Sequence, residues 1–207
     1  MNAAPQPAVA LGIDLGTSGV RAAAVAGDGT PLDMAAFPFP DAVAARSPSV
    51  WWAGVRSCVS ELASRISFAA IEGVAVDGTS GTMLAIDAGG APVGDVLMYN
   101  EPCPDRAIVE RIATEAPADS PARGATSALA RAIHLSRRPG VRAVVHQADW
   151  ILMQLGLDTP TSDENNALKT GYDLAAERWP DWLEACGMDV ALLPAVKRAG
   201  ASLSVMG

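Results

Sequence analysis

Short apolar runs separated by glycine-rich turns dominate the first forty residues of the chain. The runs at residues 8–13, 20–25 and 31–37 have the length and apolar character of β-strands. The turns between them, at residues 14–19 and 27–29, are short, so neighbouring strands are predicted to pair in antiparallel fashion. The pattern therefore predicts three consecutive antiparallel strands.

A helical period follows these strands. A Ser-Pro-Ser sequence at residues 47–49 supplies a helix start, and apolar side chains then recur at helical spacing through residues 50–66. Residues 71–76, with their valine and isoleucine content, predict a buried strand. The later predicted elements are a hairpin of residues 83–86 and 92–98, helices at 105–116, 126–137, 147–155 and 180–186, and a short strand at 143–145.

Three strands, a helix and a further strand are typical of the ribonuclease-H-like layout, in which a mixed sheet carries helices on its faces. The sequence therefore predicts an α/β fold with a mixed sheet. We expect a ribonuclease-H-like core over residues 8–102, a mostly helical part over residues 103–207 and a disordered tail over residues 1–7.

The composition excludes some classes of function. The chain has 207 residues, half of them apolar, and a formal net charge of -8. This charge argues against non-specific binding of nucleic acid or of anionic membranes, because such binding needs basic patches. The cysteines Cys58, Cys103 and Cys186 are scattered without metal-ligand spacing, which predicts reduced thiols in the cytoplasm. A signal-peptide pattern and a membrane-spanning apolar run are not found, in agreement with that location.

The first candidate site is the turn at residues 14–19. An apolar run ends at Asp14, and Gly16, Thr17 and Ser18 follow. Glycine lets backbone N–H groups approach a ligand closely, hydroxyls add donors, and such a concavity of donors suits a phosphate. The Asp14 carboxylate suits Mg²⁺ or a metal-bound water, since hard cations prefer oxygen ligands. The alternative is an ordinary glycine-rich hairpin.

Two further polar segments follow predicted strands. Thr79 and Ser80 come directly after residues 71–76, at the carboxyl end of a strand, where ligands of α/β sheets tend to bind. Asn100 and Glu101 close the next hairpin, and an amide with a carboxylate supplies the donors and acceptors that sugar hydroxyls need. The alternatives are a plain hairpin corner and a polar strand end.

The run Gly-Ile-Asp-Leu-Gly-Thr-Ser-Gly-Val-Arg at residues 12–21 resembles the first phosphate loop of the actin, hexokinase and glycerol kinase superfamily. In full it resembles the xylulose, ribulose and glycerol kinase group, the carbohydrate kinases of FGGY type. At residues 79–81 xylulose kinases carry a Gln-Met-His-Gly type sequence and glycerol kinases carry Gln-Arg-Glu. Thr-Ser-Gly at this place is similar to the D-ribulose-kinase-like branch. Tyr-Asn-Glu at residues 99–101 resembles the family's Trp-Asn-Asp or Trp-Gln-Asp.

The resemblance implies ATP and Mg²⁺ as cofactors, a ketose such as D-ribulose or D-xylulose as substrate, and a role for each candidate residue. Lys169 matches a lysine of ribulose kinases that reaches the sugar, where an ammonium supplies charge-assisted hydrogen bonds; the same polar segment also offers Asp163 or Asn165 as a plain helix N-cap. The implied roles are metal binding for Asp14, γ-phosphate binding for Gly16, Thr17 and Ser18, and sugar binding for Thr79, Ser80, Asn100, Glu101 and Lys169.

Members of this group are about twice as long and bind ATP between two ribonuclease-H-like domains. Their general base lies in a Gly-Thr-Thr-Asp-like motif that opens the second domain, and these 207 residues do not contain it. We therefore expect the N-terminal domain of a pentulose kinase, inactive alone, whose partner is the missing C-terminal domain. A bared apolar face would favour a homodimer. The alternatives are a non-catalytic sugar-binding or regulatory module and a fragment of an actin-like ATPase.

Overall fold

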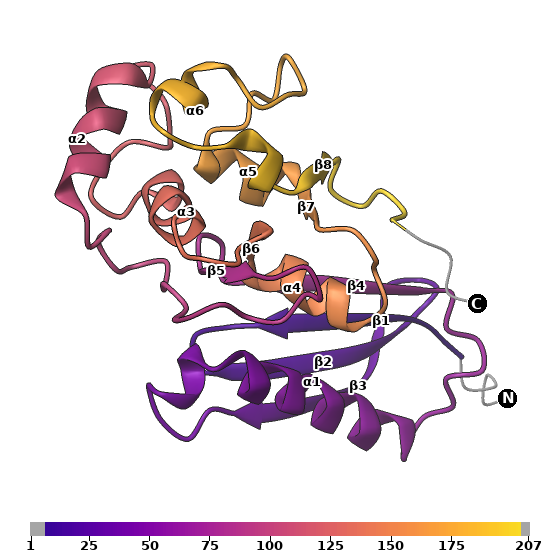
Figure 1. Ribbon diagram of the computed structural model, residues 1–207. Coiled ribbons are helices and arrows are strands. Elements are labelled where there is room, and N and C mark those ends of the chain that lie inside the picture. The colour runs from indigo at the N-terminus through magenta and orange to yellow at the C-terminus, as the bar shows by residue number, and fades with distance from the viewer. Residues whose placement is uncertain (1–6, 204–207) are drawn as a thin grey trace, which may run out of the picture. The chain divides into compact units, whose positions relative to one another are not determined.

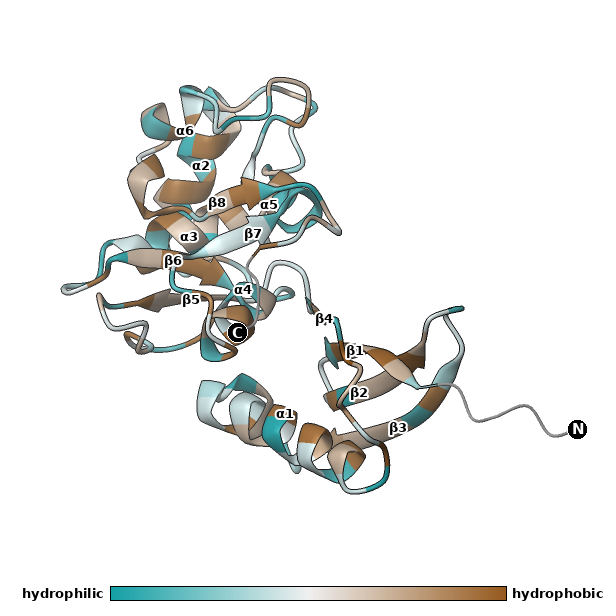
Figure 2. Cartoon of the chain, turned by 90° about the vertical axis from the view of Figure 1, so that its right-hand side faces the viewer, coloured by the Kyte–Doolittle hydropathy of each residue, from teal (hydrophilic) through white to brown (hydrophobic). Residues whose placement is uncertain are grey.

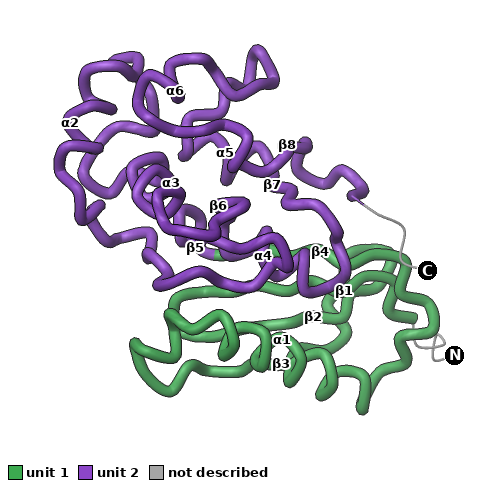
Figure 3. The backbone as a smooth tube through the Cα atoms, in the orientation of Figure 1, with its two compact units in different colours: residues 1–78 green, residues 79–207 purple. Residues whose placement is uncertain are grey.

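Residues 7–203 are described by the computed structural model, and they divide into two units, residues 1–78 and 79–207 (Figure 3). The predicted tail falls mainly on residues 1–6, which lie outside the described residues, as do residues 204–207. Each unit is a compact part of the chain. The division of the sequence into residues 8–102 and 103–207 remains a prediction.

The first unit is built on one mixed sheet (Figure 1). Its strand order is β3-β2-β1-β4, with β1 antiparallel to β2, β2 antiparallel to β3 and β1 parallel to β4. The three predicted N-terminal strands, their antiparallel pairing and the mixed α/β character are thereby confirmed. The strands are β1 Ala8–Leu15, β2 Gly19–Ala26, β3 Pro31–Pro38 and β4 Gly73–Gly78.

One helix packs on this sheet. α1 Pro48–Ala63 confirms the predicted helix and follows a short 3-10 turn, η1 Ala44–Arg46. Figure 2 shows hydrophobic and hydrophilic residues side by side along α1, as expected for a helix with one buried face. At Gly54 the helix comes so close to the sheet that a Cβ would lie 2.8 Å from Val20 Cγ2 and 2.9 Å from Phe37 Cδ1. A glycine is therefore what allows this close approach.

The prediction of a buried strand at residues 71–76 is only partly correct. The strand exists as β4, but its residues alternate between exposed and half-buried. The reason is its place in the sheet, because β4 pairs with β1 on one side and is the edge strand of the order given above. Apolar content predicts a strand, but it does not reveal which neighbours that strand will have.

The second unit combines two small sheets with helices (Figure 1). Strands β5 and β6 pair antiparallel, and β7 and β8 pair parallel. The predicted helices and the short strand at residues 143–145 are confirmed, with Asp105 and Ser127 as the N-caps of α2 and α3. In the part of the chain that the structure describes, no helix has the length and apolar character to cross a membrane. The elements are β5 Met83–Ile86, α2 Arg106–Glu115, α3 Ala128–Ser136, β6 Ala143–His146, α4 Gln147–Gln154, β7 Thr161–Asp163, α5 Glu164–Thr170, α6 Trp182–Ala185, η2 Val190–Leu192 and β8 Ala195–Lys197.

The predicted hairpin of residues 83–86 and 92–98 needs a correction. Residues 92–98 form no regular strand, and they touch β5 through the isolated bridges Met83–Leu97 and Ile86–Pro92. Pro92 has no N–H to donate, and Gly94 has a φ of +72°, so the ladder is interrupted between the two bridges. The regular antiparallel partner of β5 is instead β6, more than fifty residues later in the chain.

All three cysteines are free and buried. Burial raises the pKa of the Cys58 and Cys103 thiols and raises that of Cys186 to about 11. The thiols therefore stay protonated at neutral pH and behave as small core side chains.

Candidate functional site

The first candidate site lies in the first unit, where β1 ends at the predicted phosphate loop. Asp14 is the register partner of Arg21 on β2 and of Asp77 on β4. The Nε of Arg21 lies 3.6 Å from Oδ2 of Asp14, and both side chains are about half exposed. The same guanidinium reaches the loop, since its Nη2 would lie 3.7 Å from a Cβ on Gly16. Two carboxylates and one guanidinium therefore gather beside the loop.

The loop itself is a closed turn. The N–H of Gly16 donates to the carbonyl of Gly19 at 3.0 Å, and the N–H of Phe39 donates to the carbonyl of Ser18 at 2.9 Å. Thr17 and Ser18 are exposed at its tip. The amide of Gly16 is thus already used within the loop, which leaves Thr17 and Ser18 as the residues best placed to meet a ligand.

An open groove of about 380 Å³ runs along the adjoining face of the sheet. Gly12, Ala23, Ala75 and Met34 line it, and the charged group of Asp14, Arg21 and Asp77 lies at one end. No cluster of three or more His, Cys, Asp or Glu side chains suited to a metal occurs among residues 7–203. One or two carboxylates fit Mg²⁺ only when the remaining ligands are water and substrate phosphate, which is the usual way that this ion is held.

The second candidate site lies in the second unit and begins with residues 79–82, which we call the corner turn. The N–H of Thr82 donates to the carbonyl of Thr79 at 3.0 Å, and Gly81 has a φ of +86°. Gln147, the first residue of α4, holds both ends of the turn. Its N–H donates to the carbonyl of Thr82 at 3.0 Å, and its Oε1 accepts from the N–H of Thr79 at 3.1 Å.

Within the corner turn, the hydroxyl of Ser80 is buried and has no hydrogen-bond partner in the structure. A buried hydroxyl without a partner costs free energy, because it gives up its bonds to water. The turn is fixed on both sides by Gln147, so Ser80 has little freedom to find another partner. The hydroxyl has almost no exposed surface, so a ligand meets it only if the corner turn moves.

Residues 99–101, the second segment expected to bind sugar, lie beside the corner turn. The N–H of Tyr99 donates to Oγ1 of Thr82 at 3.3 Å. Asn100 is exposed, whereas Oε2 of Glu101 accepts from the N–H of Met98 at 2.9 Å. One carboxylate oxygen of Glu101 therefore serves the local backbone, the role that the alternative of a polar strand end gave to Asn100.

A buried arginine joins the two segments. Arg131 on α3 is 2% exposed, and it donates from Nε to the carbonyl of Gly81 at 3.1 Å and from Nη1 to the carbonyl of Glu101 at 3.0 Å. Burial lowers the pKa of its guanidinium. Sequence reasoning missed both Arg131 and Gln147. The available signal was a charged residue inside the apolar stripe of residues 128–136.

Lys169 lies on α5, and its side chain is exposed. Asp163 caps this helix, accepting from the N–H groups of Asn165 and Asn166, so the N-cap interpretation of this segment is confirmed for Asp163. The next residue after the lysine, Thr170, is buried and places its Oγ1 3.2 Å from Nε2 of His146. The start of α4 and the end of α5 are thereby joined.

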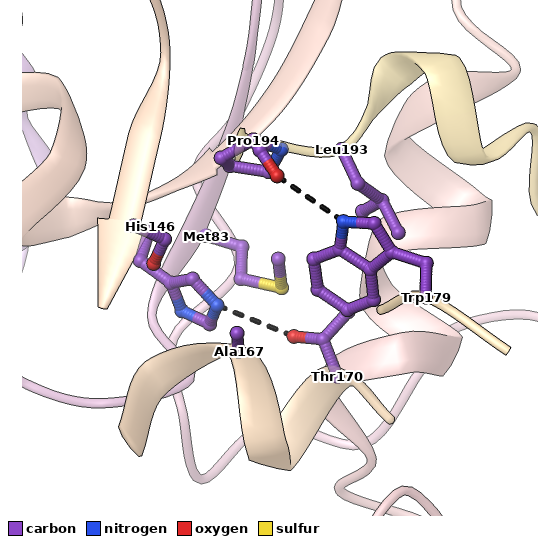
Figure 4. Close-up of a pocket in the computed structure, with 8 residues that line it drawn as sticks. Met83, His146, Ala167, Thr170, Trp179, Leu193 and Pro194 are labelled. Atoms are coloured by element: carbon purple, nitrogen blue, oxygen red, sulfur yellow. Dashed lines mark hydrogen bonds between the residues drawn. The ribbon is translucent and has the colours of Figure 1, made fainter. Parts of the chain in front are cut away.

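The space around His146 and Thr170 is shown in Figure 4. Trp179 closes it on one side, with its indole N–H donating to the carbonyl of Pro194 at 3.2 Å. This space is too narrow for a water molecule. Burial lowers the pKa of His146 to about 4. Burial likewise raises the pKa of Asp149 to about 8, and Oδ2 of this residue accepts from the backbone N–H of His146. Both groups are therefore neutral at pH 7, as part of a packed core.

The predicted residues thus fall into two groups. Asp14, Gly16, Thr17 and Ser18 gather in the first unit beside Arg21. In the second unit the structure brings residues 79–80 next to residues 100–101. Lys169 is exposed on α5, and it is the neighbouring Thr170 that contacts His146, the register partner of Met83.

No protein-family model matches the chain. Solved structures do match: a xylulose kinase from Rhodospirillum rubrum is 22% identical with a TM-score of 0.73, covering 90% of this chain and 42% of its own. Gluconate kinase from Lactobacillus acidophilus is 13% identical with a TM-score of 0.78, covering 94% and 43%. Plasmodium falciparum glycerol kinase is 13% identical with a TM-score of 0.75, covering 99% and 46%. The chain spans less than half the length of these kinases and has the fold of that part, which confirms the resemblance in fold.

Proposed function

We propose that this chain is the N-terminal, substrate-binding part of an ATP-dependent carbohydrate kinase that phosphorylates a pentulose. The observation that carries the proposal is that the corner turn and residues 99–101 lie side by side, so that hydroxyl, amide and carboxylate side chains occur together. A sugar offers many hydroxyls, and each can donate to or accept from such a group. The likeness in fold to three kinases of sugars and polyols supports the same assignment.

Within this proposal, D-ribulose is favoured over D-xylulose. Thr79 and Ser80 are smaller than the residues that xylulose and glycerol kinases carry at the corner, and the ammonium of Lys169 would donate to a sugar oxygen. A site built to pair a hydroxyl penalises a sugar that lacks or misplaces that hydroxyl, because a buried polar group is left unpaired. Asn100 and Glu101 would complete the set of sugar-binding side chains.

The loop in the first unit would serve the phosphate end of the reaction. Mg²⁺, held by Asp14 through water and by the phosphates, would neutralise charge on the transferring group. Thr17 and Ser18 would donate hydrogen bonds to phosphate oxygens, with Gly16 shaping the turn. Arg21 lies close enough to the loop to pair with a phosphate as well, and its Nε is 3.6 Å from the carboxylate of Asp14.

A polypeptide of these 207 residues should show no ketose-dependent ATP hydrolysis or transfer above background. The reason is that no Gly-Thr-Thr-Asp-like motif supplies the general base, and loss of a base alone removes a factor of about 10² to 10⁴. A coupled assay with D-ribulose, D-xylulose and glycerol measures it, with a full-length sugar kinase as the positive control. Robust turnover by the pure chain would contradict the assignment of the base to a missing domain.

Lys169→Ala should raise the Kd for D-ribulose by about tenfold to a hundredfold, since hydrogen bonds to charged groups contribute about 1.5 to 3 kcal/mol. Calorimetric titration of the wild type and the variant measures the change. Lys197→Ala is the matched control, because Lys197 is the only other lysine of the chain and is also exposed. Equal weakening by both substitutions, or tighter binding of D-xylulose than of D-ribulose, would remove the basis for preferring ribulose.

A second candidate function is a non-catalytic sugar-binding or regulatory module, favoured by the polar segments that lie side by side in the second unit, which need no catalytic group to bind a sugar. Both candidates expect ketose binding, so binding does not separate them. The discriminating observation is the gene sequence that follows the codon of Gly207. A reading frame that continues into a Gly-Thr-Thr-Asp-like motif supports the kinase, whereas an immediate stop codon supports the module.

A further inference from the structure

Arg131 is bonded to three separate segments of the second unit. Its Nε donates to the carbonyl of Gly81 at 3.1 Å, and its Nη1 donates to the carbonyls of Glu101 at 3.0 Å and Thr126 at 2.9 Å. Gly81 belongs to the corner turn, Glu101 closes the second sugar segment, and Thr126 lies just before α3. One side chain therefore sets the spacing between the two segments that the proposed function assigns to the sugar.

Burying the guanidinium of Arg131 costs free energy, which indicates a role beyond packing. Arg131 is 2% exposed, and all three of its hydrogen bonds end on backbone carbonyls. Burying a charge costs free energy that carbonyl dipoles offset only in part, and an apolar side chain of similar size often stabilises a fold as well or better. The guanidinium supplies what an apolar side chain lacks, a planar fork with fixed angles between its donors.

The backbone of Gly81 lies in close contact with this guanidinium. A Cβ on Gly81 would lie 3.0 Å from Nη2 of Arg131, and the residue has a φ of +86°, which side chains other than glycine rarely adopt. The backbone of the corner turn and the arginine therefore fit each other closely. Tyr99 lies on the same side, with its Cβ 3.7 Å from the position of that Cβ.

We infer that Arg131 is a positioning residue that holds the corner turn and residues 99–101 at the separation required by a ketose bridging both. It acts through the backbone of Gly81 and Glu101 and does not itself contact the sugar. The inference rests on the proposed function and adds to it a specificity element remote in sequence from every predicted sugar-binding residue.

The test uses the 207-residue chain, two substitutions at Arg131 and one matched control. Arg131→Met keeps most of the volume and removes all three donors, whereas Arg131→Lys keeps the charge and loses the fork. Arg138→Met is the control, because Arg138 also donates from Nη1 to two carbonyls, those of Val93 and Asp95, at 2.9 Å each, away from the corner turn. Two quantities are measured by NMR: the Kd for D-ribulose and the exchange rates of the Thr82 and Tyr99 amides.

We expect Arg131→Met to raise the Kd for D-ribulose at least about tenfold, since displaced segments leave polar groups of the sugar and the site unpaired. Arg131→Lys should fall between Arg131→Met and wild type, and Arg138→Met should stay within about twofold of wild type. The Thr82 and Tyr99 amides should exchange faster in Arg131→Met but not in Arg138→Met. If Arg131→Met fails to fold, the comparison of Arg131→Lys with Arg138→Met carries the test.

Ribulose binding within twofold of wild type in Arg131→Met, or in Arg131→Lys if Met does not fold, overturns the inference. Equal weakening by Arg138→Met shows a general effect of removing an arginine and also overturns it. If wild type binds no ketose, the proposed function fails, and the exchange rates still decide the separate point: unchanged Thr82 and Tyr99 exchange in Arg131→Met would show that the arginine does not join the two segments.

Discussion

Replacing Gly19 by alanine is expected to lower the free energy of unfolding by about 3 kcal/mol. Gly19 opens β2 opposite Pro38 of β3, and its Cα lies directly against the neighbouring backbone. A Cβ at this place would overlap the carbonyl oxygen of Phe37 and lie 2.9 Å from the Cα of Pro38. Because both atoms belong to the backbone, no side-chain rotation relieves the overlap, and the start of the β2–β3 pair must move apart.

A denaturant titration followed by circular dichroism measures this effect, and Gly12→Ala is its matched control. Gly12 lies in the adjacent strand β1, and no heavy atom would come within 4 Å of a Cβ there. Alanine at Gly12 should therefore be neutral or stabilise by up to about 1 kcal/mol, through the lower entropy of the unfolded chain. Similar stabilities for the two variants would contradict the close approach of the strands at Gly19.

The second large effect is a loss of stability as the pH rises from 6.5 to 8. Asp149 is buried with its pKa raised to about 8, so the folded chain keeps a proton that the unfolded chain has released. The folded state then binds more protons than the unfolded state, and stability falls with rising pH, by about 1.5 kcal/mol over this range. Below pH 6.5 the effect of Asp149 is largely cancelled by His146, whose pKa is lowered to about 4 and which therefore adds stability as the pH rises from 4 to 6.5.

Asp149→Asn separates this cause from others. Its amide oxygen can still accept from the backbone N–H of His146, a bond of 2.9 Å in the wild type, but the side chain no longer titrates. The variant should therefore keep its stability between pH 6.5 and 8, while the wild type loses it. Thermal unfolding at both pH values measures the difference, and an equal loss in the variant would show that another group is responsible.

Local patterns were sufficient to predict the first three strands and most helices. Residues 14–19 and 27–29 are short turns between apolar runs, so both strand pairing and direction follow from the chain itself. The exposure of β4 and the irregular path of residues 92–98 depended on partners far along the chain, β1 and β6, which a local pattern does not contain. β7 and β8 have three residues each, too short to leave a periodic signal.

In the candidate site, too, local patterns indicated some features, whereas others depended on residues far along the chain. The pattern of polar residues after strands indicated residues 79–80 and 100–101, and the structure places these segments together. It gave no indication of what holds them, because Arg131 and Gln147 lie 50 and 68 residues away from their contacts at Gly81 and Thr79. Whether an arginine in an apolar stripe is buried or turned to solvent is decided by packing, and packing is a property of the whole unit.

The buried cysteines make the chain convenient for site-directed labelling. Cys58, Cys103 and Cys186 are shielded and protonated, so maleimide or methanethiosulfonate reagents have little access to them in the folded chain. New cysteines at the exposed Val43 of the first unit and Leu174 of the second can then be labelled selectively, without first removing the native ones. A pair of spin labels at these positions would report the distance between one site in each unit, measured before and after a ketose is added.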